Sequence, residues 1–374
     1  MASGGRFAAG DEGPIVSRNL LHRLVVALLL GIAMAMAMVR AEHSDHGYGG
    51  HELTGHGRYL GVPPRQPPPP PPSQEALLAA AIKDERVTTY VLTQNVDLTT
   101  SLPMVSRPSF TVRGMCGKDG RRRCVINGMN KYRGFVANYS SHVALSLINL
   151  EFTGLRAVDD ASGGAAAAVD GGRLTVKNCV FRSNKVGRGG AGGAVLVQDG
   201  SFDISGSAFE GNAAGDVGGA IFFGSDASGN VSATKFKSNS AMAGGAVYAK
   251  EGKVNFHAVD FSANRARARG GALFLTVTES VVSKTRFNSN SAGQSGGAVH
   301  VYLEFLNTTF CSDTSFNRNT AAKDKSSSKV SIAGPEGDKS RVFFCAAKVP
   351  SGVGYEGPDS RVATGCKGCK PTGR

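Results

Sequence analysis

Residues 244–269 read GGAVYAKEGKVNFHAVDFSANRARAR, and the pattern begins again with Gly-Gly-Ala at position 270. The triplet starts at positions 192, 218, 244, 270 and 296, so the interval is 26 residues each time. Self-similarity at a fixed period of about 20–50 residues is typical of solenoids, in which each repeat stacks on the next. The period therefore predicts a repeat architecture for the middle of the chain.

A second marker, Phe-x-x-Asn, recurs in step with the first. Its copies end at Asn184, Asn212, Asn239, Asn264, Asn290 and Asn319. Each repeat also holds two β-like stretches, such as GAVYA and KVNFHAVDF, and lacks the Leu-x-x-Leu-x-Leu frame of leucine-rich repeats. We therefore expect one rung of a parallel β-helix per repeat, with equivalent positions about 4.8 Å apart. Gly-Gly would allow a corner that a Cβ blocks, Phe would stack inside, and the Asn side chains would form a structural ladder.

Gly-Gly-Ala followed by Ile, Leu or Val, paired with Phe-x-x-Asn, resembles the repeat of polymorphic outer-membrane proteins and of right-handed, pectin-lyase-like β-helix proteins. The resemblance covers residues 145–325 clearly and residues 75–145 by strand pattern only. It implies an all-β fold, a right-handed parallel β-helix with rungs of about 26 residues. In function, it implies adhesion or surface display, although fold alone does not decide function.

The composition changes along the chain and predicts four segments. An apolar run at 24–39 follows Arg18 and Arg23 and is shorter than the ~20 residues that a membrane span needs. This pattern is typical of a cleaved signal peptide, with an uncleaved signal anchor as the alternative. The predicted segments are a signal peptide at 1–41, a His/Gly- and Pro-rich linker at 42–74, a β-helix with a short N-terminal helix cap at 75–321, and a Cys-bearing C-terminal cap or tail at 322–374.

Several features agree with an extracellular protein. Sequons for N-glycosylation begin at Asn138, Asn230 and Asn307. No zinc-like spacing joins the seven Cys residues, so we expect disulfides and neither a metal nor a cofactor. The short polar loop between Cys116 and Cys124 suits one disulfide. Further candidate pairs are Cys311 with Cys345 and Cys366 with Cys369, which would leave Cys179 as a free buried thiol.

The formal net charge of +13 favours acidic partners. In an extracellular protein these would be acidic polysaccharides or glycan surfaces. The chain has no aromatic–basic recognition motif of nucleic-acid-binding proteins, so no nucleic acid is expected.

Catalytic motifs are sparse. Of the motifs of polygalacturonases, the chain has only Asp159-Asp160 and an out-of-order Gly55-His56-Gly57 in the linker. The other acidic candidates fall in different columns of the repeat: Asp199, Asp203, Glu251 and Asp260. A hydrolase needs two carboxylates about 5–10 Å apart, which this scatter disfavours. We therefore predict a non-catalytic protein, with a polysaccharide lyase that uses Lys or Arg as the alternative.

The strand after Gly-Gly-Ala carries a candidate glycan-binding stripe. Its aliphatic residues alternate with rings, so the rings should point outward. The predicted binding residues are Phe222, Tyr248, Lys250, Phe274, His300 and Tyr302. Sugar faces pack on such rings, and an exposed apolar stripe usually has a partner. The alternatives are cover by residues 322–374, self-association with a second copy, or a purely structural rod.

Overall fold

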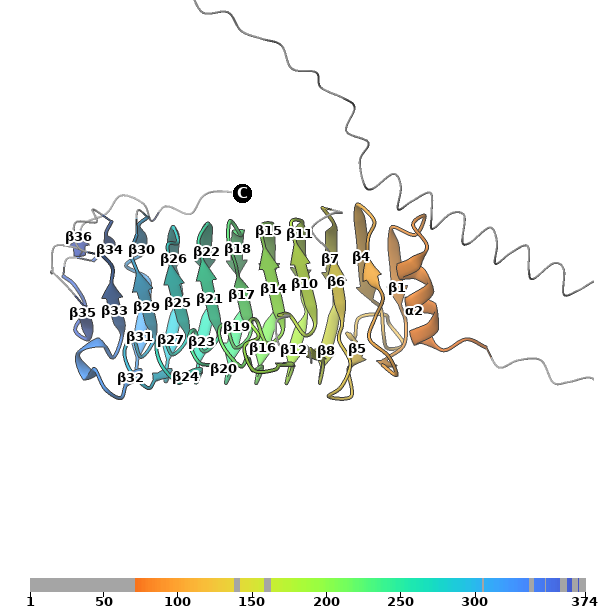
Figure 1. The fold of residues 1–374 in the computed structure, drawn as a ribbon, viewed down its shortest axis with the longest axis horizontal. Helices are drawn as coiled ribbons and strands as arrows, with labels where there is room; N and C mark the ends of the chain where they lie inside the picture. The colour runs from red at the N-terminus through yellow and green to blue at the C-terminus, as the bar shows by residue number, and fades with distance from the viewer. Residues whose placement is uncertain are drawn as a thin grey trace, which may run out of the picture. The chain divides into compact units, whose positions relative to one another are not determined.

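The computed structural model describes residues 71–374 apart from 138–141, 158–162, 305, 336–339, 347, 357–361, 365–368 and 370–374. The chain forms a parallel β-solenoid of about nine turns of ~27 residues, with very little helix. The predicted all-β parallel β-helix is therefore confirmed. Figure 1 shows the turns stacked side by side along the horizontal axis, from the N-terminal helix to the last strands. The predicted signal segment and the predicted linker up to residue 70 lie outside the described residues, and the last predicted linker residue, Gln74, begins the N-terminal helix.

Most strands of the described residues belong to three long parallel sheets. Sheet A contains, in stacking order, β1 (Thr89–Leu92), β4 (Ser109–Gly114), β7 (Ala144–Ile148), β11 (Arg173–Lys177), β15 (Ser201–Ser205), β18 (Ser228–Ser232), β22 (Lys253–His257), β26 (Ser280–Ser283), β30 (Thr308–Phe310), β34 (Val342–Phe344) and β36 (Val362–Thr364). Sheet B contains β2 (Val96–Asp97), β5 (Cys124–Asn127), β8 (Leu150–Thr153), β12 (Val180–Arg182), β16 (Ala208–Glu210), β19 (Lys235–Lys237), β23 (Asp260–Ser262), β27 (Arg286–Asn288) and β31 (Ser315–Asn317).

Sheet C and a row of short strands complete each turn. Sheet C contains β3 (Met104–Val105), β6 (Phe135–Ala137), β10 (Ala167–Asp170), β14 (Val195–Gln198), β17 (Ile221–Phe223), β21 (Val247–Lys250), β25 (Leu273–Thr276), β29 (Val299–Tyr302), β33 (Val330–Ala333) and β35 (Val353–Glu356). The short-strand column contains β9 (Arg156–Ala157), β13 (Lys185–Val186), β20 (Ser240–Ala241), β24 (Arg265–Ala266), β28 (Ser291–Ala292) and β32 (Thr320–Ala321). A central turn runs from sheet A to sheet B, through the short-strand column, to sheet C.

Equivalent residues of successive turns form straight columns through the core. The Phe column consists of Phe152, Phe181, Phe209, Phe236, Phe261, Phe287 and Phe316, whose neighbouring ring centroids lie 4.6 to 5.0 Å apart. Each such ring pair adds roughly 0.5–1.5 kcal/mol beyond the burial of its area. The core is thus a stack of identical contacts, which explains why the sequence returns to the same residues.

The buried Asn residues form a ladder beside the Phe column. Asn239 donates through Nδ2 to Phe209 O (3.0 Å) and to Asn264 Oδ1 (2.9 Å). Its own Oδ1 accepts from the backbone N and from Nδ2 of Asn212, at 2.9 and 3.0 Å. The same bonds link Asn184 through to Asn319. These Asn residues are therefore structural, because they satisfy backbone groups at the turn between sheet B and the short strands.

Glycine is required at each position of the Gly-Gly pair, for a different physical reason. Gly244 has a φ of +59°, which a side chain rarely adopts. A Cβ on Gly245 would lie 2.1 Å from the carbonyl oxygen of Gly271 in the next turn. The first glycine thus makes the corner, and the second lets neighbouring turns approach closely.

The helix α2 (Gln74–Lys83) covers the N-terminal end of the core (Figure 1). Its N-cap residue Ser73 accepts a hydrogen bond from Ala76 N at 3.1 Å. Leu78 and Ile82 are buried in the core. Glu75 anchors the helix, because it accepts from the backbone N of Thr99 at 2.8 Å.

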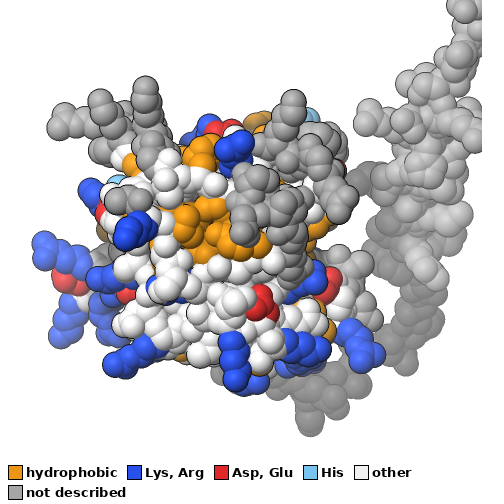
Figure 2. Space-filling view, turned by 90° about the vertical axis from the view of Figure 1, so that its left-hand side faces the viewer, with side chains coloured by type: hydrophobic (Ala, Val, Ile, Leu, Met, Phe, Trp, Pro, Cys, Tyr) orange, Lys and Arg blue, Asp and Glu red, His pale blue; other side chains and the backbone are white. Residues whose placement is uncertain are grey.

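Beyond residue 321 the chain continues the same sheets. The segment from 322 onward, expected to be a cap or tail, contributes the 3-10 helix η2 (Lys325–Ser327) and the strands β33 to β36. Figure 2 looks onto this end and shows hydrophobic side chains in the middle with Lys and Arg around them. Val353, Tyr355 and Val362 pack there against the core and are only partly buried.

Candidate functional site

The predicted ring stripe lies on the outer face of sheet C. Its aliphatic neighbours, such as Val247, are fully buried in the core, so the expected facing is correct. The ring column consists of Phe222, Tyr248, Phe274 and His300, one residue per turn. Successive centroids lie 5.8, 4.8 and 4.5 Å apart. The rings therefore contact one another rather than standing separately in solvent.

The ring column is less accessible than the alternation predicts. Phe222, Tyr248 and Phe274 are half-buried. His300 is fully buried at 0% exposure, so its predicted place on an open wall is wrong. Burial and the nearby Arg269 lower the pKa of His300 to about 3. Burial, with the nearby Asp216, raises the pKa of Tyr248. The loops that follow the short strands thus border the column.

The polar residues of the stripe, Lys250 and Tyr302, are also less available to a ligand than expected. Lys250 Nζ lies 3.4 Å from Glu251 Oε1, which offsets the charge expected to attract an acidic sugar. Tyr302 is half-buried and lies in register with Thr276 and Ala333. Glycan binding by this stripe stays a prediction, with less open surface than the sequence suggests.

The acidic candidates do not form a catalytic pair among the described residues. Asp260 is bound to Arg286 at 3.0 Å, and Glu251 faces Lys250. Asp203 lies on sheet A, while Asp199 lies in a turn with a φ of +48°. Burial, followed by the charge of Asp199, raises the pKa of Asp170. Asp159 and Asp160 lie outside the described residues.

A basic groove, not predicted from the sequence, runs along the short-strand column. It has a volume of about 600 Å³ and is lined by the exposed side chains of Arg156, Lys185, Arg188, Arg265 and Arg267. Its lining contains no Asp or Glu among the described residues. Small residues occupy the stretch between the cations: Ala213, Ala214, Gly215, Ser240 and Ala241. A concave strip of this kind presents positive charge to a long ligand.

The charges of the basic groove differ from those of sheet B. On sheet B, Arg182 binds Glu151 at 2.7 Å and Glu210 at 3.0 Å, so cations and anions alternate from turn to turn. Within the described part of the chain, no ion pair involves any of the five cations that line the groove. The cations of sheet B are therefore offset by neighbouring carboxylates, whereas the cations of the groove have no such ion pairs in the described part of the chain.

A sequence signal for the groove exists. Lys185 directly follows the ladder residue Asn184, and Arg265 directly follows Asn264. The position after Phe-x-x-Asn is therefore the outward column of the short strands. This position therefore predicts that Lys185 and Arg265 lie on the same face, but it does not predict that Arg188 and Arg267 from the loops join them.

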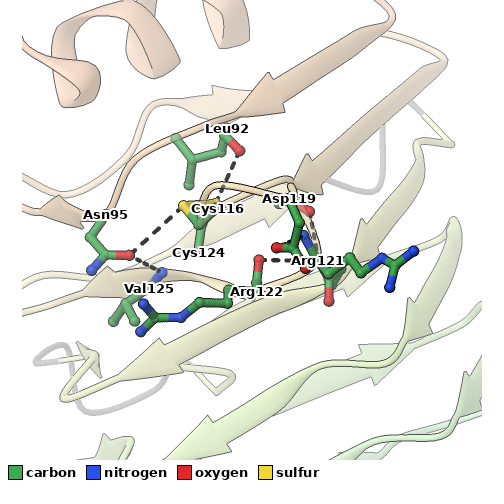
Figure 3. Close-up of a disulfide and its surroundings, with 10 residues drawn as sticks. Leu92, Asn95, Cys116, Asp119, Arg121, Arg122, Cys124 and Val125 are labelled. Atoms are coloured by element: carbon green, nitrogen blue, oxygen red, sulfur yellow. Dashed lines mark hydrogen bonds between the residues drawn. A yellow bond between two sulfur atoms is a disulfide. The ribbon is translucent and has the colours of Figure 1, made fainter.

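A second hollow, of about 380 Å³, has mixed charge. It is lined by Arg121, Arg122 and Arg123 together with Glu151. The arginines belong to a hairpin whose ends are joined by a disulfide between Cys116 and Cys124 (Figure 3).

The hairpin is held by hydrogen bonds at both ends. Cys116 N donates to Arg122 O at 3.0 Å, and Arg122 N donates back to Cys116 O at 2.9 Å. Arg123 donates through Nε to Asn178 O at 2.7 Å, which fixes the hairpin to the solenoid wall. The guanidinium of Arg123 thus has a structural role in holding the hairpin.

The other cysteines fall into two groups. Cys311 is joined to Cys369, so the expected pairings of Cys311 with Cys345 and of Cys366 with Cys369 are both wrong. Cys366 itself lies outside the described residues. The Sγ atoms of Cys311, Cys345 and Cys369 all lie within 4.8 Å of one another, because the end of the chain returns to the corner after β30. Cys179 is a free, buried thiol whose pKa is raised to about 12 by burial.

The described sequon residues lie at sheet A. Asn230 is exposed on β18, where its Oδ1 accepts from Asn255 Nδ2 at 3.1 Å. Asn307 is exposed just before β30. Asn138 lies outside the described residues. Glycans at these positions would leave the basic groove open, since sheet A and the short-strand column occupy different sides of each turn.

Comparison with known proteins gives no assignment: no family model, no curated protein and no solved structure matches the chain. Among the described residues, no helix is long and apolar enough to span a membrane.

Proposed function

We propose that this protein is a non-catalytic extracellular binding module for acidic polysaccharides of a cell wall, matrix or surface. One observation carries the proposal: five exposed cations line one groove without an ion-pair partner among the described residues. An acidic polymer is the partner whose charge matches such a groove.

The fold and the sequence support this proposal in different ways. Solenoids offer extended surfaces that bind elongated partners. The disulfides Cys116–Cys124 and Cys311–Cys369 suit an oxidising compartment. The resemblance to polymorphic outer-membrane protein repeats and to pectin-lyase-like β-helices points to adhesion or surface display, and secretion remains part of the proposal.

The runner-up is a polysaccharide lyase that uses Lys or Arg as its base. A general base works best with a pKa near the working pH, and for Lys or Arg burial of the side chain is the main way to bring the pKa down to that range. The cations of the groove are exposed, which favours retention of the polymer over its cleavage.

A binding assay with purified protein and a panel of acidic and neutral polysaccharides tests the proposal. We expect binding to acidic polymers that weakens as salt is raised, without release of unsaturated ends. Arg265→Glu/Arg267→Glu should weaken it about tenfold or more, whereas the matched pair Arg173→Glu/Lys177→Glu on sheet A should not. Cleavage products would favour the lyase, and a protein that binds no acidic polymer would be a structural rod.

A further inference from the structure

The cations of the basic groove form two clusters. Arg156 and Lys185 are paired neighbours in the short-strand column, and Arg188 follows in the adjoining loop. The second cluster consists of Arg265 and Arg267. Between them the column passes through Ala213 and Ser240, which carry no charge. The groove thus has two positive ends separated by a neutral stretch.

The strand register sets the distance between the clusters. Lys185 is in register with Ala213, Ala213 with Ser240, and Ser240 with Arg265. At the ~4.8 Å spacing of neighbouring strands, the two clusters lie roughly 14 Å apart along the solenoid axis. This backbone separation is several times the ~4 Å of one ion pair, so a ligand with several anionic groups matches the two clusters better than a single small anion.

We propose that the groove binds a linear acidic polysaccharide lying parallel to the solenoid axis, with anionic groups on both clusters at once. This inference rests on the proposed function and names its ligand geometry. The small residues of the neutral stretch, among them Ala214, Gly215 and Ala241, leave space for a chain to pass between the clusters.

The lining favours a polysaccharide over a single-stranded nucleic acid. Proteins that bind single strands stack the bases on aromatic side chains. The residues that line the groove include no Phe, Tyr or Trp in the described part of the chain. The groove therefore offers charge without stacking surfaces, which suits a polymer whose anionic groups are carried on sugars.

Simultaneous contact is what gives the ligand its affinity. One exposed ion pair contributes little, since water and salt screen it. A chain that occupies one cluster holds its next anionic groups near the other, so the second contact forms at a high effective concentration. Affinity should therefore rise steeply once the ligand is long enough to span both clusters.

Isothermal titration calorimetry with sulfated oligosaccharides of graded length tests this. A disaccharide should bind at least tenfold more weakly than an octasaccharide of the same charge per sugar. Lys185→Gln/Arg188→Gln removes two of the three cations of the first cluster, and Arg265→Gln/Arg267→Gln removes both cations of the second. Each should reduce the octasaccharide affinity about tenfold and remove most of the dependence on length. The control Arg173→Gln/Lys177→Gln removes equal charge from sheet A and should keep that dependence.

The outcomes separate this inference from the proposed function. If neither oligosaccharides nor polymers bind, the proposed function itself fails. If octasaccharide binding is normal in both cluster variants, or if affinity per charge does not depend on length, the bridged geometry is overturned while binding stands. A single-stranded oligonucleotide of equal charge that binds as tightly as the octasaccharide would overturn the ligand class.

Discussion

At the scale of single residues, His300 couples the outer face of sheet C to pH. Its ring contacts that of Phe274 in a tilted arrangement, with centroids 4.5 Å apart, and neither ring nitrogen has a hydrogen-bond partner among the described residues. The folded protein holds the pKa of His300 at about 3, whereas an unfolded His titrates near ~6.5. Below pH ~6.5 the unfolded state therefore binds a proton that the folded state does not. As the pH is lowered from ~6.5 towards the folded pKa, the free energy of unfolding decreases.

His300→Phe should remove this pH dependence. At pH ~5 the free energy of unfolding of the wild type is lower by about 2 kcal/mol than at neutral pH. A Phe ring at this position keeps the contact with Phe274 without a titrating group. Urea denaturation of both proteins between neutral pH and pH ~4 checks the prediction. His257→Phe is the matched control, because His257 is only partly buried and hydrogen-bonds Ser283. Parallel stability curves for wild type and His300→Phe would contradict it.

Cys179 should be chemically inert and replaceable by Ser. Burial raises its pKa to about 12, so little nucleophilic thiolate forms. Later turns place Ser207, Thr234, Val259 and Thr285 at the equivalent position, and each of the three hydroxyls donates to the carbonyl two residues earlier at 2.7 to 2.9 Å. Cys179 Sγ makes the corresponding contact with Lys177 O at 3.3 Å.

We therefore expect native protein to resist alkylation at Cys179, and Cys179→Ser to change the free energy of unfolding by less than about 1 kcal/mol. Cys179→Leu, which overfills the site, should cost roughly 1–3 kcal/mol. Mass spectrometry after iodoacetamide treatment and denaturation curves measure both. Rapid alkylation of the folded protein would show that the site opens.

At the scale of the repeated elements, the Asn ladder should be worth more than any exposed Asn. Asn239→Ala removes the Oδ1 atom that accepts two hydrogen bonds and the Nδ2 group that donates two, and it leaves Asn212 N and Phe209 O without their partners. We expect a loss of about 3 kcal/mol or more, because each buried unsatisfied group costs roughly 1–3 kcal/mol. Asn288→Ala, at an exposed position of β27, should stay within about 0.5 kcal/mol. Equal losses for the two variants in thermal denaturation would refute a special role for the ladder.

The same columns explain what the sequence can predict. Gly244 recurs every 26 residues, and Phe261 and Asn264 recur once in each repeat at intervals of 25 to 29 residues, so the repeat alone indicates the solenoid and its inner columns. The alternation also gives the correct facing of Tyr248. The solvent exposure of an outward-facing side chain cannot be predicted in this way, because it depends on how the loops fold over the sheet. The burial of His300 beside Arg269 therefore has no signal in the repeat.

The basic groove escapes prediction for a related reason. Arg156, Lys185 and Arg265 come from three repeats at one column, while Arg188 and Arg267 come from loops between columns. Whether they converge depends on the angles between the sheets of each turn, which the period does not encode. Net charge predicts an acidic partner, but the ion pairs of sheet B show that only part of that charge is available.

At the scale of the whole molecule, the two ends of the solenoid are held differently. The N-terminal end is covered by α2, which buries Leu78 and Ile82 against the first turn. The C-terminal end is tied by the disulfide between Cys311 and Cys369, which are 58 residues apart in sequence. In a solenoid each turn contacts only its neighbours, so a terminal turn can open without the rest. The disulfide therefore acts as a clamp on the last turns.

Removing this clamp should loosen the C-terminal turns selectively. A loop of this length contributes about 4 kcal/mol in the chain-entropy model, against roughly 2.5 kcal/mol for the eight-residue Cys116–Cys124 loop. Cys369→Ser, combined with Cys345→Ser so that Cys311 has no replacement partner, should therefore speed amide hydrogen exchange in β33, β34 and β36, while β14 to β25 keep their protection. Cys116→Ser is the control, and its effect should remain near the N-terminal hairpin. Faster exchange along the whole chain in this double variant would mean that the solenoid unfolds as one unit, and unchanged exchange in β34 would mean that strand pairing alone holds this end.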